Sequence, residues 1–403
     1  MVTVQVGIVG KPNAGKSTFF SAATLTMVPI ANYPFTTIKP NHGISYLRVK
    51  CVCKGLGVQD TPRNSRCIDG ERFIPVDVVD LPGIVPGAAE GKGLGNRFLD
   101  EVRRADALIH VVDASGSTDS EGKLVPPGSH DPQVDVVFLT KELELWMFHI
   151  MTREWDKISR RADITSDEII DAITDRLSGL GVKRYHVEES LKTIGLRGNV
   201  SSWSKDDLVG LLGLLRKRSK PILLAANKID MPTSPGNFER LKEIEALTIP
   251  VSSEAELALR RAAEKKMIDY KPGDSFFSAS DRFPLSLEQK AALNVIKERV
   301  LSHFGTTGVQ DCINSSFLRL LSMIVVYPVE DPEHFTDHSG SVLPDAILVP
   351  RGTTLKELAL RIHSELGESL LYGVNARNSM RLSESYVLKD GDVVSIVSTA
   401  QRR

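Results

Sequence analysis

The chain has 403 residues, which is enough for two or three domains with a sizeable core. Its 50 Lys and Arg residues nearly balance its 51 Asp and Glu residues, and the net charge of −1 excludes a strongly basic nucleic-acid binder. No apolar run reaches the roughly 20 residues that cross a bilayer, the N-terminus lacks a signal-peptide pattern, and 4 cysteines make no disulfide framework. These features together predict a cytoplasmic protein, and we also expect a monomer with no DNA and no membrane partner.

Four apolar, β-branched runs predict buried strands. They occupy residues 4–9, 75–80, 108–113 and 221–227. Residues 16–23, directly after the first run and its glycine-rich loop, favour a helix. Near-continuous apolar strands that alternate with helices indicate a mostly parallel sheet with helices on both faces. The sequence therefore predicts an α/β fold.

A helical insertion interrupts this pattern between the third and fourth runs. A loop rich in Pro, Gly and Ser over 115–132 leads into residues 134–215, which we predict to be helical. Helix N-terminal signals stand at Thr165 and Ser204, each followed three residues later by an acidic side chain. Helical periodicity resumes at residues 254–267 and 287–304.

The C-terminal part has a different pattern, typical of a small α+β module. Strands are predicted at 324–329 and 346–349, a helix with an apolar stripe at 355–366, and an Asp-Gly turn before a last strand. The expected domains are an α/β unit, a helical insertion, a helical connector and the α+β module. Their expected bounds are 1–133 with 216–270, then 134–215, 271–319 and 320–403.

A phosphate-binding loop follows the first predicted strand. Gly10-Lys-Pro-Asn-Ala-Gly-Lys-Ser17 fits the pattern G-x-x-x-x-G-K-[ST] between a strand and a helix. Its backbone N–H groups and the helix N-terminus would face the phosphates, Lys16 would reach the β- and γ-phosphates, and Ser17 would ligate Mg²⁺. The expected nucleotide contacts in this loop are Gly10, Lys11, Pro12, Asn13, Ala14, Gly15, Lys16, Ser17 and Thr18.

A second motif predicts that the base is guanine. Asn227-Lys228-Ile-Asp230 ends a predicted strand, and the Asp230 carboxylate can accept hydrogen bonds from guanine N1–H and N2–H₂, a donor pair that adenine lacks. The stem of Lys228 can cover the base. Ser252 and Ser253 follow one β-unit later, where a loop could offer backbone N–H to guanine O6.

Two segments are expected to sense the γ-phosphate. Asp80 ends an apolar strand where a carboxylate would support Mg²⁺, and the N–H of Gly83 can meet the γ-phosphate. Thr37, 20 residues after Ser17, is the expected second Mg²⁺ ligand, with Thr36 as the alternative and Phe35 beside the nucleotide. We assign catalysis to Lys16, Thr37 and Gly83. Residues 83–95 contain 5 glycines, which predicts a mobile switch segment rather than a helix.

Together these motifs resemble the Obg superfamily of GTPases, and most closely its YchF-like branch in the archaeal and eukaryotic subgroup. The resemblance is strongest at residues 80–99 and 32–41. Residues 320–400 resemble a TGS domain with a ubiquitin-like β-grasp fold. The resemblance implies a P-loop GTPase domain with a helical insertion and a C-terminal TGS domain. It also implies a GTP-dependent switch whose partner is the ribosome or ribosomal RNA.

Some residues leave alternatives open. Bacterial and human YchF-like proteins alter the base motif and prefer ATP, whereas Asn227 and Asp230 are kept here, which implies GTP. Ile84 stands where Ras-like enzymes carry the water-orienting Gln, so we expect slow isolated hydrolysis, at about 10⁻⁴–10⁻² s⁻¹. An ATPase of the same fold and a nucleotide-stabilised scaffold whose turnover is irrelevant are the competing hypotheses.

Two metal questions remain from the sequence. In related GTPases with an Asn at the position of Asn13, this side chain helps to hold K⁺ beside the phosphates, which predicts faster hydrolysis in K⁺ than in Na⁺. Cys51, Cys53 and Cys67 could ligate Zn²⁺, but three cysteines with one residue between the first two depart from the usual four-ligand spacing. A reduced surface insertion is the simpler interpretation of the cysteines.

Overall fold

The computed structural model describes residues 4–25, 41–83, 101–153, 155, 165–196, 200–245, 247–280 and 283–399. Its larger sheet has seven strands in the order β2-β4-β1-β5-β6-β7, with β3 paired to β4. The strands are β1 (Gln5–Val9), β2 (His42–Lys50), β3 (Arg66–Ile68), β4 (Glu71–Asp80), β5 (Ala107–Asp113), β6 (Ile222–Asn227) and β7 (Thr248–Pro250). From β4 to β7 the pairs are parallel, while β2 and β3 pair antiparallel to β4. The expected α/β sheet is confirmed.

Alternate residues of the parallel strands face two separate cores. On one face, Val6 and Ile109 pack with α1 (Lys16–Thr24) and α13 (Val309–Ser315). On the other face, Val9 and Leu108 pack with α4 (Pro132–Thr152) and α9 (Ser234–Ile244). Because side chains alternate along a strand, burial of both faces explains the near-continuous apolar runs in the sequence.

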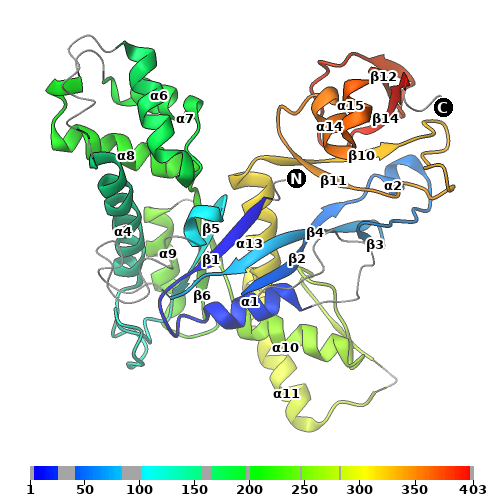
Figure 1. Cartoon of the computed structure of the whole chain (residues 1–403). Helices are drawn as coiled ribbons and strands as arrows, with labels where there is room; N and C mark the ends of the chain where they lie inside the picture. Colours follow the sequence, from blue (N-terminus) through cyan, green and yellow to red (C-terminus); the bar gives the residue numbers. More distant parts are fainter. Residues whose placement is uncertain are drawn as a thin grey trace.

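The helical insertion forms its own core and stands apart from the C-terminal part of the chain (Figure 1). It comprises the far end of α4 with α6 (Ser166–Leu177), α7 (Arg184–Ile194) and α8 (Lys205–Ser219). Thr165 and Ser204 cap α6 and α8 in reciprocal capping boxes with Glu168 and Asp207, as the sequence predicted. The predicted leucine face of α8 is buried, because apolar side chains of α4, α6 and α7 pack against it.

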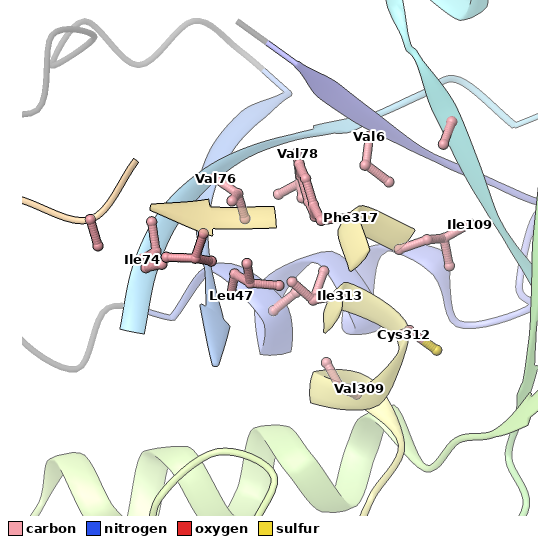
Figure 2. Close-up of a cluster of buried hydrophobic side chains, with 14 of the residues drawn as sticks. Val6, Leu47, Ile74, Val76, Val78, Ile109, Val309, Cys312, Ile313 and Phe317 are labelled. Atoms are coloured by element: carbon pink, nitrogen blue, oxygen red, sulfur yellow. The ribbon is translucent and has the colours of Figure 1, made fainter. Parts of the chain in front are cut away.

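Helices on the connector side complete the first core. After β7 come α10 (Ser253–Glu264), the short strands β8 (Ile268–Asp269) and β9 (Ser278–Ala279), α11 (Leu287–Ile296) and α12 (Ser302–Phe304). The helix α13 and the following π-helical turn then cross the sheet. Figure 2 shows Ile313 and Phe317 among the strand side chains Val78 and Ile109. Through α13 and this turn the connector joins the core of the larger sheet, whereas Leu293 of α11 packs in a separate cluster with Leu259 of α10 and Ile268 of β8.

The smaller sheet has five strands in the order β11-β10-β14-β12-β13. It consists of β10 (Met323–Val329), β11 (Ile347–Pro350), β12 (Leu370–Asn375), β13 (Met380–Leu382) and β14 (Val393–Ser398), with α14 (Leu355–Ile362) and α15 (Ser364–Glu368) between β11 and β12. Only β10 and β14 pair in parallel within it. This is the β-grasp arrangement that was expected, and the apolar stripe of α14 packs on the sheet through Leu355, Leu358 and Ala359.

The two sheets are joined by contacts as well as by chain. Tyr327 of β10 and Leu343 belong to the same buried cluster as residues of β1 and β4. Near them, α2 (Cys53–Leu56) and β3 lie on the side of the larger sheet that faces the smaller one (Figure 1).

Within the described ranges, no helix has both the length and the apolar character needed to cross a membrane.

Candidate functional site

The loop between β1 and α1 adopts a tight curve that only glycine permits at one point. Gly15 has φ 93°, and a Cβ on it would lie 2.1 Å from the Nδ2 atom of Asn227. Asn13 also has a positive φ, of 61°. The loop thus turns into α1 at Lys16 with the free N–H groups of the first helical turn at this end of the sheet, an arrangement suited to phosphate.

Asn227 ties this loop to the segment after β7. It is buried at the end of β6, and its Nδ2 donates to the carbonyl of Ala14 at 2.9 Å. Its Oδ1 accepts from the backbone N–H of Ser253 at 3.1 Å and from the Ser253 hydroxyl at 2.9 Å. Three segments that the sequence separates are held together by one amide, and each of them was predicted to contact the nucleotide.

Asp230 lies beside Ser252 at the same edge. The Ser252 hydroxyl donates to Asp230 Oδ1 at 2.8 Å. A carboxylate offers about four lone-pair sites, so Asp230 keeps acceptors for another ligand. Lys228, with φ 61°, directs its ammonium to Asp113 Oδ2 at 2.9 Å and to the Ser117 hydroxyl at 3.1 Å.

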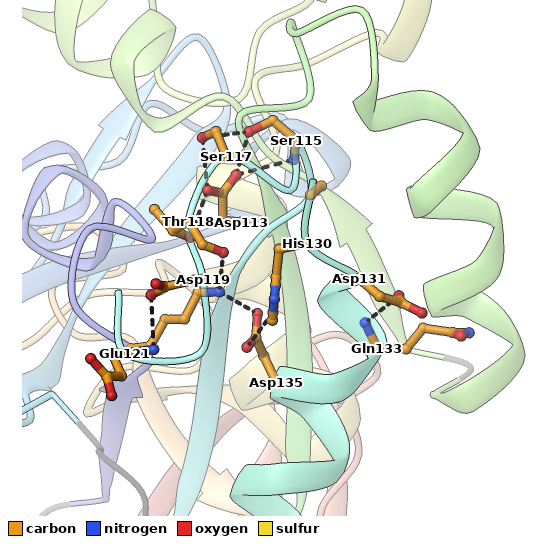
Figure 3. A network of polar contacts seen from close by, with 12 residues as sticks. Asp113, Ser115, Ser117, Thr118, Asp119, Glu121, His130, Asp131, Gln133 and Asp135 are labelled. Carbon is orange, nitrogen blue, oxygen red and sulfur yellow. Dashed lines mark hydrogen bonds and ion pairs between the residues drawn. The ribbon is translucent and has the colours of Figure 1, made fainter. Parts of the chain in front are cut away.

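Asp113 is the centre of a buried polar network that the sequence analysis did not find (Figure 3). Burial acts to raise the pKa of this carboxyl, but hydrogen bonds from Ser115, Lys228 and Thr118 outweigh it, so the pKa of Asp113 is lowered. The side chain therefore stays charged and holds the start of the loop that follows β5. Its only sequence signal is a polar residue at the end of an apolar strand, followed closely by Ser115, Ser117 and Thr118.

The loop after β5 covers one side of the phosphate-binding loop. The Lys11 ammonium is buried, ion-paired with Asp135 at 2.8 Å, and donates to the Thr118 carbonyl at 2.8 Å. The Asn13 Nδ2 donates to the Gly122 carbonyl at 2.9 Å. Any contact between Lys11 and a phosphate would therefore come from its backbone N–H and not from its side chain.

Asp135 completes this support on the helix side. Its Oδ1 atom lies 2.9 Å from the Nε2 of His130, and its Oδ2 atom pairs with Lys11 (Figure 3). Asp135 is in the first turn of α4, where a helix N-terminus favours a negative charge. His110, next to this region in β5, is buried as predicted for a core histidine, and burial together with the charge of Lys11 lowers its pKa to about 3.

The described residues among those proposed for Mg²⁺ and the γ-phosphate follow the carboxyl ends of β1 and β4. Lys16 forms an ion pair with Asp80. Ser17 is exposed in the first turn of α1, and a Cβ on Gly83 would lie 3.5 Å from Pro12. Hydroxyl and carboxylate oxygens are the ligands that Mg²⁺ prefers, so this donor set fits the ion.

Part of the predicted site lies outside the described residues. This applies to Phe35, Thr36 and Thr37, to Ile84, and to the glycine-rich segment beyond Gly83. The described part contains the phosphate-binding loop, Asp80, the Asn227–Asp230 motif and the Ser252–Ser253 turn, all at one edge of the sheet.

Three family models match the chain. The 50S ribosome-binding GTPase model matches residues 5–139, the Obg-like GTPase YGR210-like G4 motif-containing domain matches 225–331, and the TGS domain matches 339–398. Most of the helical insertion, from residue 140 to 215, lies between the first two of these regions along the chain.

Three of the relatives described here match nearly the full length of this chain, and a fourth matches part of it. An uncharacterized GTP-binding protein of Methanocaldococcus jannaschii is 47% identical over 98% of this chain and 100% of its own. A crystal structure of a GTP-binding protein from Pyrococcus horikoshii is 38% identical, with a TM-score of 0.77 over 98% of this chain and 100% of its own. The Schizosaccharomyces pombe YchF GTPase, 18% identical, shares the fold with a TM-score of 0.56 over 98% of each chain. A protein named ribosome-binding ATPase YchF, from Mycoplasma genitalium, is 32% identical over 60% of this chain and 61% of its own.

Proposed function

Because the chain belongs to the YchF-like branch of the Obg-superfamily GTPases, with a C-terminal TGS domain, we propose that it hydrolyses GTP to GDP and phosphate as a slow molecular switch. The observation that supports this most directly is the Asn227 amide. It binds the phosphate loop at Ala14 and the base-side turn at Ser253 in one geometry. A guanine nucleotide bound along this edge would contact both segments.

Guanine recognition is assigned to Asp230 and the turn at Ser252 and Ser253. With Ser252 donating to Oδ1, the carboxylate is oriented and can accept from N1–H and N2–H₂ of guanine. Adenine would present an acceptor where guanine presents N1–H, so the carboxylate would lose a charged hydrogen bond worth about 1.5–3 kcal/mol. Lys228 is held by Asp113 in a position that orders the motif.

Hydrolysis would use the charges at the other end of the site. Water attacks the γ-phosphorus, and the bond to the β–γ bridging oxygen breaks to leave GDP and phosphate. Lys16, now paired with Asp80, would exchange that partner for the β- and γ-phosphates, and Asp80 would support Mg²⁺ with Ser17 and Thr37 as ligands. When bound, Mg²⁺ would offset the negative charge that develops on the phosphate oxygens. Gly83 would donate its N–H to the γ-phosphate.

Nucleotide competition tests the base assignment. We expect GTP and GDP to displace a fluorescent guanine nucleotide far better than ATP does, and Asp230→Asn to reduce this discrimination by about tenfold or more, since one charged hydrogen bond is worth about 1.5–3 kcal/mol. Glu239→Gln on α9, an exposed acidic side chain, is the matched control and should leave it unchanged. Preference of the wild type for ATP would overturn the assignment in favour of the ATPase alternative.

The ribosome, through its RNA or a protein, is the proposed partner. The support is the family name of the Mycoplasma relative and the TGS domain at residues 339–398. Pelleting with purified ribosomes should recover the protein with a non-hydrolysable GTP analogue and recover less with GDP. Absence of recovery in every nucleotide state would remove the translation role and leave GTP hydrolysis untouched. Equal recovery in every state would favour the nucleotide-stabilised scaffold.

Asn13 is the proposed K⁺ ligand, with a constraint from the structure. Its Nδ2 is engaged by the Gly122 carbonyl, so the amide oxygen is the atom left for a cation. We expect faster hydrolysis in K⁺ than in Na⁺ and loss of the difference in Asn13→Ala. Equal rates in the two salts would exclude K⁺ from the site.

The domain division is also a proposal. We assign 1–133 and 216–270 to the GTPase domain, 134–215 to the helical insertion, 271–319 to the connector and 320–403 to the TGS domain. The separate apolar core of α6, α7 and α8 supports the second of these units. Because α13 packs against β2 and β6, we expect the connector to unfold together with the GTPase domain.

A further inference from the structure

A compact knuckle lies at the end of the larger sheet remote from the nucleotide site. It comprises residues 51–70, between β2 and β4, and includes α2 and β3. Cys51 directly follows β2, Cys53 begins α2, Asp60 lies in the loop after α2, and Cys67 is in β3. The backbone N–H of Cys51 donates to the Gly70 carbonyl at 2.8 Å, which closes the knuckle.

The fold brings these four side chains to one point. One ligand atom from each of Cys51, Cys53, Asp60 and Cys67 lies within 4.8 Å of the others. The Sγ atoms of Cys53 and Cys67 are 3.9 Å apart, and Cys51 Sγ lies 3.2 Å from Asp60 Oδ2. Two sulfur atoms on a tetrahedral zinc ion are about 3.8 Å apart when each Zn–S bond is about 2.3 Å. These two separations are close to those of a four-coordinate site, and the other ligand atoms would have to close from at most 4.8 Å to about 3.8 Å to bind the same ion.

We propose that Cys51, Cys53, Cys67 and Asp60 form a structural zinc site. Three thiolates and one carboxylate supply the four ligands that a closed zinc site needs, and soft sulfur ligands favour Zn²⁺ over Mg²⁺ or Ca²⁺. Metal binding converts the three thiols to thiolates and releases three protons to solvent. Asp60 is the ligand that the sequence spacing hides, because it lies in a loop with no cysteine or histidine beside it.

The surroundings of the knuckle supply the charge and the order that such a site requires. Cys51, Cys53 and Asp60 are each at most 6% exposed and Cys67 is half-buried, so three of the four ligands are shielded from water. The buried Arg72 guanidinium donates to Asp60 Oδ2 at 2.7 Å. One carboxylate can accept this bond and still ligate a metal, and hydrogen bonds of this kind orient metal-binding carboxylates. The cation also offsets the negative charge of three thiolates and a carboxylate around Zn²⁺.

Tyr327 is a second, independent observation at the same place. Its hydroxyl is buried, and no hydrogen-bond partner for it is present among the described residues. Its ring lies 5.7 Å from the Arg72 guanidinium carbon, and Arg72 in turn donates to Asp60 of the cluster. A thiolate formed on metal binding would be an acceptor for this hydroxyl.

The site would order the contact between the two sheets. Arg72, which contacts Asp60, also donates to the Leu343 carbonyl at 2.7 Å. The backbone N–H groups of Thr61 and Arg63 donate to the carbonyls of Val342 and Pro344 at 2.9 and 2.8 Å. A zinc ion on Asp60 would therefore stiffen the loop on which the segment before β11 is docked. This role does not depend on which nucleotide the protein binds.

Metal analysis of the full-length protein tests the proposal. The protein is stripped with a chelator under reducing conditions, incubated with zinc alone and dialysed. We expect one zinc per chain in the wild type and in Cys312→Ser, and less than a tenth of that in Cys67→Ser. Cys312 is the matched control because it is also a buried thiol but lies in α13, outside the cluster. Equal zinc in Cys67→Ser and the wild type, or none in the wild type, would overturn the proposal.

A cobalt titration tests the site on the wild-type protein alone, so it does not depend on whether a variant folds. The stripped wild type titrated with Co²⁺ should develop the visible bands of tetrahedral thiolate coordination and saturate at one ion per chain. Weak bands typical of octahedral oxygen coordination would exclude the site.

Mass spectrometry of the freshly purified protein, alkylated in denaturant without reductant, should show four free thiols once the metal is removed. A disulfide between Cys53 and Cys67 would identify the cluster as a redox pair and overturn the metal assignment.

Discussion

The two ends of β4 each carry an ion pair, and the pairs differ in burial. At the carboxyl end, Lys16 and Asp80 have side chains 12% and 17% exposed. At the amino end, Arg72 and Asp60 are 0% and 2% exposed. A partly exposed pair can exchange partners when a charged ligand arrives, whereas a buried pair cannot separate without a large desolvation penalty. The carboxyl end of β4 is therefore suited to a ligand that binds and leaves, and its amino end is suited to one that stays bound.

The largest effect should follow from breaking the buried pair. Arg72→Met leaves the Asp60 carboxylate charged and unpaired inside the protein, which we expect to lower the free energy of unfolding by about 3–5 kcal/mol. Denaturant unfolding of the nucleotide-free, zinc-stripped protein measures this, because a zinc ion on Asp60 would itself offset the charge of the carboxylate. The control is Lys271→Met, which removes a pair with Asp69 whose carboxylate is 75% exposed, and it should cost about 1 kcal/mol or less. Equal losses in both variants would show that burial does not distinguish the pairs.

At the other end of β4, removal of the cation should affect catalysis and not stability. We expect Lys16→Ala to reduce single-turnover GTP hydrolysis by about 10²–10³-fold, the usual loss for one donor to a developing negative charge. Its melting temperature should stay near that of the wild type, because Asp80 can be solvated. Lys123→Ala, on the loop that covers the phosphate site, removes a lysine that is 74% exposed and should change neither quantity. A melting-temperature loss as large as that of Arg72→Met would contradict the contrast between the two ends.

A smaller, pH-dependent effect should appear at the nucleotide end of the sheet. Burial and the charge of Lys11 lower the pKa of His110 to about 3, while in the unfolded chain it is near 6.5. Between these values the unfolded state binds the proton and the folded state does not, so the stability contribution of neutral His110 is complete above pH 6.5 and falls as the pH falls. The fall approaches about 1.4 kcal/mol per pH unit.

The free energy of unfolding of His110→Leu, compared with that of the wild type between pH 6.5 and 4.5, measures this contribution of His110. The variant should show a shallower loss of stability than the wild type, since leucine takes up no proton. His334→Leu is the control, because His334 is exposed and its pKa is raised by Asp331, so it cannot produce the same slope. Identical pH profiles for His110→Leu and the wild type would show that His110 is protonated in the folded protein.

The grouping of the described site motifs at one edge of the sheet was largely predictable, because each motif is local in the chain and follows a strand of that sheet. Gly10 to Ser17 combine a turn, a helix start and a cation within eight residues. Asn227 to Asp230 likewise combine an amide, a lysine and a carboxylate, the groups proposed to bind the base, within four residues. The supporting layer was not predictable. The burial of Lys11 against Asp135 and the role of Asp113 arise only when the loop after β5 folds over the phosphate-binding loop.

The sequence by itself determined the elements and the fold class, because strand and helix periodicities, capping residues at Thr165 and Ser204, and glycine in tight turns are local properties of the chain. The tertiary structure decided which distant groups meet. It placed α13 in the core of the larger sheet and Asp60 among three cysteines. Such contacts depend on how irregular loops are packed, and loop packing leaves no periodic signal in the sequence.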